Sequence, residues 1–132
     1  MTEGIRLLVV NEQSDYFDLV QQYAGLLEPS CTMQCKYAES GSIAGQIMKD
    51  WTPTVVILDA HLEDANSFEL LRGMSETHAS VVVTSSHFSK DIEKSSVERG
   101  ASAYVVASED HDALEQLLEI VVELSAPQEV PQ

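Results

Sequence analysis

Basic residues are scarce in this sequence. It contains 7 Lys and Arg residues against 22 Asp and Glu residues, and its formal net charge at pH 7 is −15. Nucleic-acid-binding proteins draw much of their affinity from Lys and Arg side chains that neutralise phosphates, and anionic membranes attract basic segments for the same reason. The composition therefore argues against direct binding to nucleic acid and against binding to a membrane surface.

Long hydrophobic runs are also missing. No apolar run approaches the roughly 18 residues that a membrane-spanning helix requires. The first ten residues, MTEGIRLLVV, have neither the basic start nor the small-residue cleavage site of a signal peptide. We therefore expect a cytoplasmic protein with no membrane span. Its 132 residues fit one domain, which we place at residues 1–124. The Pro- and Gln-containing segment 125–132 is expected to be a disordered tail or the start of a linker.

Only two cysteines are present, Cys31 and Cys35. The surrounding segment CTMQCKYA alternates between apolar and polar residues, which is typical of a strand with one buried face. Four residues along a strand span about 13 Å, whereas a disulfide needs Cα atoms within about 7 Å. We therefore expect two free, buried thiols. A zinc site would need further ligands at a suitable spacing, and the neighbouring sequence offers none.

The positive signal is an alternation of strand and helix patterns. Continuous apolar runs at residues 5–10, 54–58, 80–84 and 103–106 predict strands that are covered on both faces, and the alternating segment 32–38 fits an edge strand better. Apolar stripes with helical spacing lie between and after these runs. The resulting order, βαβαβαβαβα, is typical of an α/β protein with a parallel sheet and helices on both faces.

Several residues mark where the predicted helices begin, end or bury a face. Ser40 is a suitable N-cap for the helix that follows it, and Gly100 is a suitable C-terminal signal for the helix predicted at 91–100. Apolar stripes identify the other helices. They comprise Phe17, Val20, Ala24 and Leu27; Phe68, Leu71 and Met74; and Leu114, Leu117, Leu118 and Val121.

Polar residues follow the predicted strands at the points where each strand ends. Asn11 and Glu12 follow the first run, Asp59 follows TVVIL, and Thr84 ends the fourth strand. Ligands of open α/β sheets bind beyond the carboxyl ends of the strands, so these side chains are expected to converge. Asp59 is the central residue, because a lone carboxylate directly after a buried strand is costly unless something uses it.

Four segments, taken in order, resemble the receiver domain of bacterial response regulators in two-component signalling. They are VVNEQSD, LDAHLEDANSFELL, VVVTSS and GASAYVVAS. The resemblance extends from residue 5 to about residue 124. It implies a flavodoxin-like, doubly wound fold with a five-stranded parallel sheet in the order 2-1-3-4-5 and five helices.

The resemblance also implies a role for individual residues. Asp59 stands at the phospho-accepting position, which receives a phosphoryl group from a histidine kinase, a phosphotransfer protein or a small phosphodonor. Glu12 stands at the position of a direct Mg²⁺ ligand, and His61 stands where a backbone carbonyl contacts the same ion. Thr84 corresponds to the hydroxyl residue that contacts the phosphoryl group, and Tyr104 corresponds to the aromatic switch residue. Ordinary strand packing is the alternative interpretation of Thr84 and Tyr104.

Three departures from the family pattern bear on this assignment. Asn11 replaces an aspartate that reaches Mg²⁺ through water, so the metal site is expected to be weakened. Ala107 replaces a lysine whose charge-assisted hydrogen bond to the phosphoryl group is worth roughly 1.5–3 kcal/mol. Lys90 is either a spatial substitute for that lysine or simply an exposed lysine at a helix start. Glu63 and Ser67 replace a proline and a glycine, which is expected to alter the loop after Asp59.

Two functional hypotheses remain open. In the first, phosphorylation of Asp59 changes the affinity of a protein partner for the face formed by helix 91–100, strand 103–106 and the last helix. In the second, the chain is a pseudo-receiver, an interaction module that does not depend on phosphorylation. We do not expect an enzyme. An aspartate-nucleophile phosphatase needs a second carboxylate where His61 stands, and no Walker-type glycine loop is present. The sequence leaves open whether the domain belongs to a longer regulator.

Overall fold

Strands and helices alternate along the chain in a computed structural model that describes residues 4–27 and 30–125. The elements are β1 Ile5–Val10, α1 Ser14–Gly25, β2 Met33–Ala38, α2 Gly41–Asp50, β3 Val55–Asp59, α3 Ser67–Ser75, β4 Ser80–Ser85, α4 Lys90–Glu98, β5 Ala103–Val106 and α5 His111–Ser125. In this part of the chain the strands form one parallel sheet in the order β2-β1-β3-β4-β5. The predicted alternation, the predicted strand order and the flavodoxin-like fold class are confirmed.

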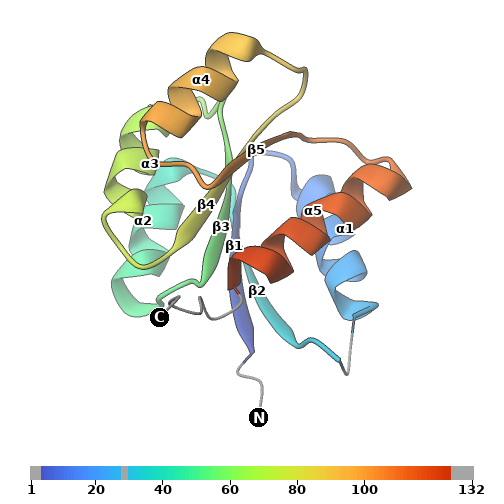
Figure 1. Cartoon of the computed structure of the whole chain (residues 1–132). Helices are drawn as coiled ribbons and strands as arrows, with labels where there is room; N and C mark the ends of the chain where they lie inside the picture. The colour runs from blue at the N-terminus through green and yellow to red at the C-terminus, as the bar shows by residue number, and fades with distance from the viewer. Residues whose placement is uncertain (1–3, 28–29, 126–132) are drawn as a thin grey trace, which may run out of the picture.

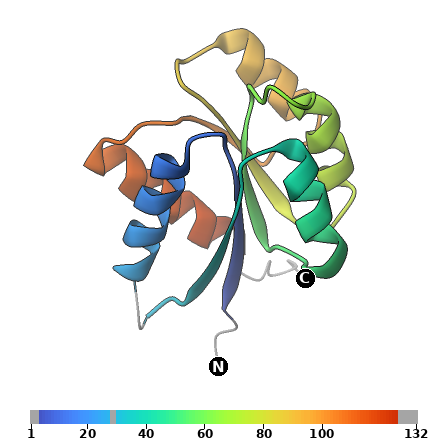
Figure 2. The ribbon, with the colours of Figure 1, turned by 180° about the vertical axis from the view of Figure 1, so that it is seen from behind.

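The sheet separates two hydrophobic cores, and Figures 1 and 2 show the helices that cover its two faces. Helices α1 and α5 cover one face, and α2, α3 and α4 cover the other. Successive residues of β1 point to opposite faces: Leu7 and Val9 enter the α1–α5 core, and Leu8 and Val10 enter the other. A strand covered on both faces has no polar side, which explains the continuous apolar run. Within the described residues, no helix is long and apolar enough to cross a membrane.

The two edge strands are less buried than the central ones. Strand β2 keeps the alternating pattern that predicted an edge. Residues 103–106 do form a strand, but the prediction that it is covered on both faces is wrong. Its first three residues are half-buried, and Val106 is 37% exposed. The reason is that β5 lies at the open edge of the sheet and has a neighbour on one side only.

The two cysteines are free thiols, as predicted. They are not buried, however, because both lie at the β2 edge of the sheet and pack only partly against the α1–α5 core. Cys31 precedes β2, and Cys35 is in its middle. Even this partial burial raises the pKa of the Cys35 thiol above its ordinary value, since it disfavours the thiolate.

Both predicted helix signals are confirmed. The Ser40 hydroxyl accepts a hydrogen bond from the backbone N–H of Ile43 at 3.1 Å and caps α2. Gly100 has a φ of +104° directly after α4, a conformation that favours glycine. A Cβ atom there would also lie 2.8 Å from the Cβ atom of Ser75. The predicted tail at 125–132 lies outside the described residues, except for Ser125 at the end of α5.

Candidate functional site

The carboxyl ends of the central strands meet at one edge of the sheet, where the structure has a pocket of about 410 Å³. The pocket is lined by Asn11, Glu12, Gln13 and Tyr16 on the β1–α1 side, Asp59 and His61 at the end of β3, Ser86 after β4, and Ala107, Ser108 and Glu109 after β5. The predicted site residues Asn11, Glu12, Asp59 and His61 therefore converge. Thr84 and Tyr104 are not part of this lining.

Asp59 is the last residue of β3 and is half-buried in the pocket. Burial raises the pKa of its carboxyl group above the ordinary value, because desolvation disfavours the charged form. A hydrogen bond at 3.1 Å from the backbone N–H of His61 to Oδ1 acts in the opposite direction. The nearby Glu12 carboxylate adds a further upward shift. The charged form of Asp59 would therefore gain from a bound cation.

Asn11 and Glu12 organise the loop between β1 and α1. Asn11 is only 5% exposed, and its Oδ1 accepts a hydrogen bond at 2.7 Å from the backbone N–H of Gln13. Glu12 reaches across to the loop after β3, where its Oε2 accepts a hydrogen bond at 2.7 Å from the backbone N–H of Glu63. Among the described residues, the second carboxylate oxygens of Glu12 and Asp59 have no hydrogen-bond donor. Each residue thus keeps an oxygen for a ligand.

The donor chemistry of the pocket fits a hard divalent cation. As the structure describes it, the lining contains three carboxylates, those of Glu12, Asp59 and Glu109, and no Lys or Arg. Magnesium is held by oxygen ligands, usually one or two carboxylates with waters and phosphate oxygens. Glu12, Asp59, the Asn11 side chain and the His61 carbonyl are all oxygen donors. An anion would be repelled by the same pocket unless a cation neutralised it.

A second group of possible metal ligands lies elsewhere. One atom each from His111, Asp112 and Glu115 lie within 4.8 Å of one another at the start of α5. All three residues are exposed, and none of them lines the pocket around Asp59. The His111 ring already contacts the Glu115 carboxylate through Nε2 and shares a hydrogen bond at 2.7 Å with the Tyr23 hydroxyl through Nδ1, so this group is explained by ordinary contacts on the surface of a helix.

Thr84 lies beside Asp59 on the neighbouring strand, since the two residues are register partners of β3 and β4. Its side chain is fully buried, and within the described part of the chain its Oγ1 has no hydrogen-bond partner. An unsatisfied buried hydroxyl costs free energy, and most buried polar groups in proteins avoid this state. The Thr84 hydroxyl is therefore a donor next to Asp59 that has no partner among the described residues.

Tyr104 is attached to the loop between β4 and α4. Its hydroxyl forms a short hydrogen bond with the Ser85 hydroxyl and accepts another at 3.1 Å from the backbone N–H of Ser89. Its ring packs against Phe88 with the ring centroids 6.0 Å apart. The sequence analysis did not identify Ser85 as a partner of Tyr104. The serine pair after VVVT was visible, but only the register of β4 and β5 decides which serine meets the tyrosine.

The loop after Asp59 is held by side chains. The Ser67 hydroxyl donates a hydrogen bond at 2.7 Å to the backbone carbonyl of Asp59. The Asp64 carboxylate accepts hydrogen bonds from the backbone N–H groups of Gly41 and Ser42, which lower its pKa. No described residue other than glycine has a positive φ, so Ser67 needs no glycine-like conformation. The departure from the family pattern at Ser67 is therefore accommodated by hydrogen bonds.

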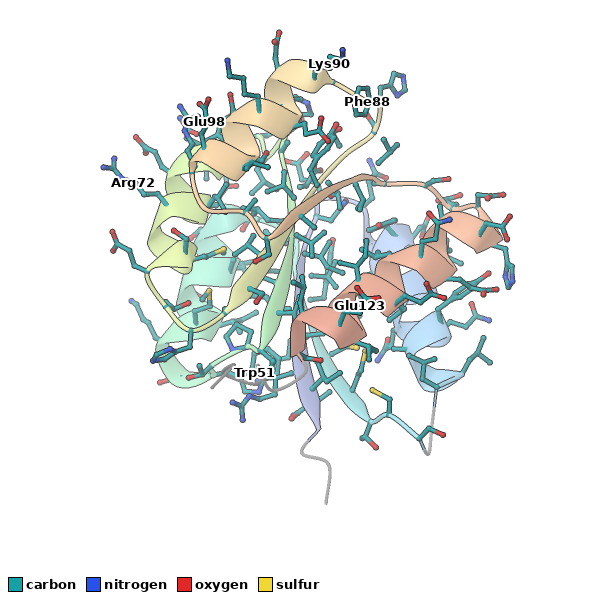
Figure 3. The ribbon with its side chains drawn as sticks, in the orientation of Figure 1. Trp51, Arg72, Phe88, Lys90, Glu98 and Glu123 are labelled. Carbon is teal, nitrogen blue, oxygen red and sulfur yellow. The ribbon has the colours of Figure 1, made fainter. Side chains whose placement is uncertain are left out.

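Among the described residues, no Lys or Arg lines the pocket in place of the lysine that the family usually has at position 107. Ala107 is half-buried and lines the pocket at the end of β5. Lys90 is the exposed first residue of α4 and is absent from the lining. Figure 3 shows it at the outer end of α4, directed toward solvent. Of the two interpretations of Lys90, the structure supports an exposed lysine at a helix start.

Tyr16 is a pocket residue that the sequence analysis missed. It is 6% exposed, and its pKa is raised to about 12 by burial and then by the charge of Asp59. The raised pKa keeps its hydroxyl protonated even at pH values where an ordinary tyrosine ionises, so it is a neutral donor in the same pocket as Asp59. The buried stripe of α1 is Tyr16, Val20 and Ala24, whereas Phe17 is half-buried. Counting back four residues from Val20 would have identified Tyr16.

The sequence matches no protein-family model, and no curated protein matches it either. The structure, however, resembles solved signal receiver domains. A response regulator from Thermotoga maritima superimposes with a TM-score of 0.80 and 23% identity over 93% of this chain and 98% of that chain. The response regulator domain of Thermotoga maritima CheB has a TM-score of 0.79 and 18% identity, covering 96% of this chain and 100% of its own.

A third similar structure is the signal receiver domain of a DNA-binding response regulator from Colwellia psychrerythraea 34H. Its TM-score is 0.78 and its identity 20%, over 91% of this chain and 99% of that chain. The chain therefore has the receiver-domain fold of response regulators. At these identities the likeness concerns the fold, and the chemistry depends on the residues described above.

Proposed function

We propose that this chain is a phosphoacceptor receiver domain of a two-component system, phosphorylated on Asp59 in the presence of Mg²⁺. The observation that carries the proposal is the half-buried Asp59 carboxylate at the end of β3, in a pocket lined by oxygen donors. A carboxylate oxygen of Asp59 attacks the phosphorus atom of the donor. The new P–O bond forms as the bond from phosphorus to the donor's histidine nitrogen, or to the oxygen of an acyl phosphate, breaks. The freed histidine or carboxylate leaves with the bonding electrons.

The residues around Asp59 would bind the metal ion and the transferred phosphoryl group. Glu12, Asp59 and the His61 carbonyl would hold Mg²⁺, and Asn11 would reach it weakly through water. The bound ion supplies positive charge that neutralises the transferred phosphoryl group. The Thr84 hydroxyl has no hydrogen-bond partner among the described residues. It would therefore be available to donate a hydrogen bond to a phosphoryl oxygen once Asp59 is phosphorylated.

Tyr16 and Tyr104 complete the proposed site. The protonated Tyr16 hydroxyl offers a second, neutral donor near Asp59. Tyr104 is a candidate switch residue, because its hydroxyl is bound to the β4–α4 loop directly after Thr84. Movement of that loop would release or tighten this contact.

This function implies two kinds of protein partner, one that donates the phosphoryl group and one that receives the signal. A histidine kinase or phosphotransfer protein would supply the phosphoryl group. A downstream protein would bind the face formed by α4, β5 and α5, where three apolar side chains are exposed: Phe88 at 59%, Val97 at 58% and Val106 at 37%. Figure 3 shows Phe88 directed outward from the β4–α4 loop. The acidic charge argues for protein partners rather than nucleic acid or membrane. We propose that the chain acts as a cytoplasmic signalling module and not as an enzyme.

The first test is covalent labelling of Asp59. The protein is incubated with Mg²⁺ and acetyl phosphate, and its intact mass is measured. We expect a mass increase of one phosphoryl group in the wild-type chain and none in Asp59→Asn, because the amide cannot form the acyl phosphate. Asp64→Asn is the matched control, since Asp64 is an exposed carboxylate of the same loop that caps α2. An adduct that persists in Asp59→Asn, or no adduct in the wild type, would contradict the proposal.

Magnesium binding is expected to depend on Glu12 and on pH. Glu12→Gln removes a charged ligand and should raise the Mg²⁺ dissociation constant about tenfold or more, measured by isothermal titration calorimetry. Glu63→Gln is the control, because only its backbone contacts the site. Protons compete with Mg²⁺ for Asp59, and the pKa of Asp59 is raised. As pH falls, the affinity should therefore begin to drop at a higher pH than an ordinary aspartate would allow. Equal affinities in both variants would contradict this assignment of the metal ligands.

The alternative function is a pseudo-receiver that binds its partner without phosphorylation. It is favoured by the absence of Lys and Arg from the described pocket lining, where Ala107 faces three carboxylates. Such a pocket repels phosphodonors unless Mg²⁺ is bound. The labelling experiment separates the two functions, because a pseudo-receiver acquires no phosphoryl group under conditions that label a typical receiver.

A further inference from the structure

A second hollow lies on the opposite side of the molecule from α3 and α4, between α1 and α5. Its volume is about 590 Å³, and it shares no lining residue with the pocket around Asp59. In Figure 1, α5 crosses in front of α1 on this face of the sheet. We call this hollow the α1–α5 groove. None of its lining residues takes part in the proposed phosphorylation chemistry, and none of the exposed apolar residues of the face formed by α4, β5 and α5 lines it.

The floor of the α1–α5 groove is apolar. It is formed by Leu27, which packs against the core, together with Leu118 and Val122 from α5. Leu26 borders the groove at the end of α1 and is 71% exposed, the most exposed large hydrophobic residue among those described. A single exposed leucine is unremarkable. An exposed leucine at the mouth of an apolar hollow provides a place for another apolar side chain.

The rim of the groove is acidic. Glu115, Glu119 and Glu123 line it at intervals of four residues, so they form one row along α5. Figure 3 shows Glu123 on the exposed side of this helix. Among the described residues, these three glutamates of α5 are the acidic residues of the lining, and neither α1 nor α5 contains a Lys or Arg. The basic residues Arg72 and Lys90 lie on α3 and α4 instead (Figure 3).

The negative charge of the rim determines which kind of partner can bind in the groove. A second copy of this chain would bring one glutamate row against another, and like charges facing each other are destabilising. A nucleic acid or an anionic membrane would be repelled for the same reason. A partner with Lys or Arg beside its apolar residues matches both rim and floor. The groove lies between two helices, a geometry that accepts the apolar face of an amphipathic helix.

We propose that the α1–α5 groove is a docking site for an amphipathic helix of another protein, with leucine-like residues on one face and Lys or Arg along the flank that faces α5. The apolar face enters the hollow between Leu26 and Val122. The basic flank pairs with Glu115, Glu119 and Glu123. This interaction is independent of the state of Asp59.

The test uses a synthetic amphipathic peptide as probe, with leucines at helical i, i+4 and i+7 spacing and lysines at the flanking positions. Binding to the isotope-labelled full chain is followed by NMR chemical-shift changes, and affinity by calorimetry. We expect the shifts to concentrate on α1 and α5. A scrambled peptide of identical composition and a peptide with glutamate in place of lysine should bind at least about tenfold more weakly, because each lacks one half of the complementarity.

Two double variants provide a matched control for general charge attraction. Glu119→Lys with Glu123→Lys reverses two rim charges, and Glu93→Lys with Glu98→Lys reverses two exposed charges on α4. Both change the net charge equally. The rim variant should weaken binding by about tenfold, and the α4 variant by less than about twofold, because only the first reverses charges that face the peptide. Asp59→Asn should bind like the wild type, so failure of the phosphorylation proposal does not affect this test. Equal weakening in both double variants, or shifts concentrated on α4 and β5, would overturn the proposal.

Discussion

A lysine at position 107 is expected to strengthen phosphoryl binding more than any other single substitution. In Ala107→Lys, the affinity for beryllofluoride, a phosphoryl mimic, should rise about 10- to 100-fold in the presence of Mg²⁺. The physical reason is a charge-assisted hydrogen bond worth roughly 1.5–3 kcal/mol, where about 1.4 kcal/mol corresponds to a factor of ten. Ala107 lines the pocket directly, and its backbone N–H is fixed by a hydrogen bond to the Ser85 carbonyl at 2.8 Å. Affinity is measured by fluorescence or calorimetric titration.

The control for this substitution is Ala107→Met, which adds a long flexible side chain without charge. It should bind beryllofluoride no more tightly than the wild type. A gain in Ala107→Met equal to that in Ala107→Lys would mean that pocket volume, and not charge, limits binding. No gain in Ala107→Lys would contradict the view that the missing lysine weakens the site.

Replacement of Thr84 by valine is expected to stabilise the fold while impairing the site. Thr84→Val keeps the shape of the side chain and removes a buried hydroxyl that has no partner among the described residues. The free energy of unfolding should rise by about 1–2 kcal/mol, since an unsatisfied buried polar group costs roughly 1–3 kcal/mol. The affinity for beryllofluoride should fall about 3- to 10-fold, because a neutral hydrogen bond contributes roughly 0.5–1.5 kcal/mol. Urea unfolding measures the first effect, and titration measures the second.

Thr84→Ser separates the two effects of this substitution. It keeps the hydroxyl and loses a buried methyl group, so it should destabilise the fold by roughly 0.5–1.5 kcal/mol and leave the affinity for beryllofluoride near that of the wild type. If Thr84→Val lowered both stability and affinity, the hydroxyl would have a structural partner. The interpretation of the Thr84 hydroxyl as a donor that is free to bind the phosphoryl group would then be wrong.

The two substitutions address opposite features of the proposed site, one in the lining of the pocket and one on the buried strand beside Asp59. Ala107 lacks the positive charge that would bind the phosphoryl group. Thr84 carries a buried hydroxyl that forms no hydrogen bond with any described residue. Proteins commonly accept local free-energy costs at functional sites. A buried Thr84 hydroxyl without a partner among the described residues and a raised Asp59 pKa support our proposal of retained phosphorylation. The described pocket lining contains no Lys or Arg, and we therefore propose that switching is weakened.

Much of the fold could be predicted because hydrophobic periodicity reports burial directly. Strands β1 and β5 have the predicted bounds, and Ser40 and Gly100 mark the helix ends as expected. The convergence of Asp59 and Glu12 in one pocket could be predicted because parallel strands bring their carboxyl ends to one edge of a sheet. The burial of β5 and of Cys31 and Cys35 could not be predicted from local pattern, because it depends on which strands lie at the edges and how far the helices cover them.

The amino-acid sequence by itself determined the order of elements, the acidic charge and the residues that follow each strand, because these depend on local composition and spacing. The tertiary structure alone decided the rest. It brought Tyr16 into the same pocket as Asp59 and kept Lys90 out of its lining. Among the described residues, it also left the Thr84 hydroxyl without a partner. It also aligned the glutamates of α5 with the apolar floor of the α1–α5 groove. The physical reason is that contact, burial and pKa depend on groups distant in sequence, whose positions are fixed only when strands and helices pack together.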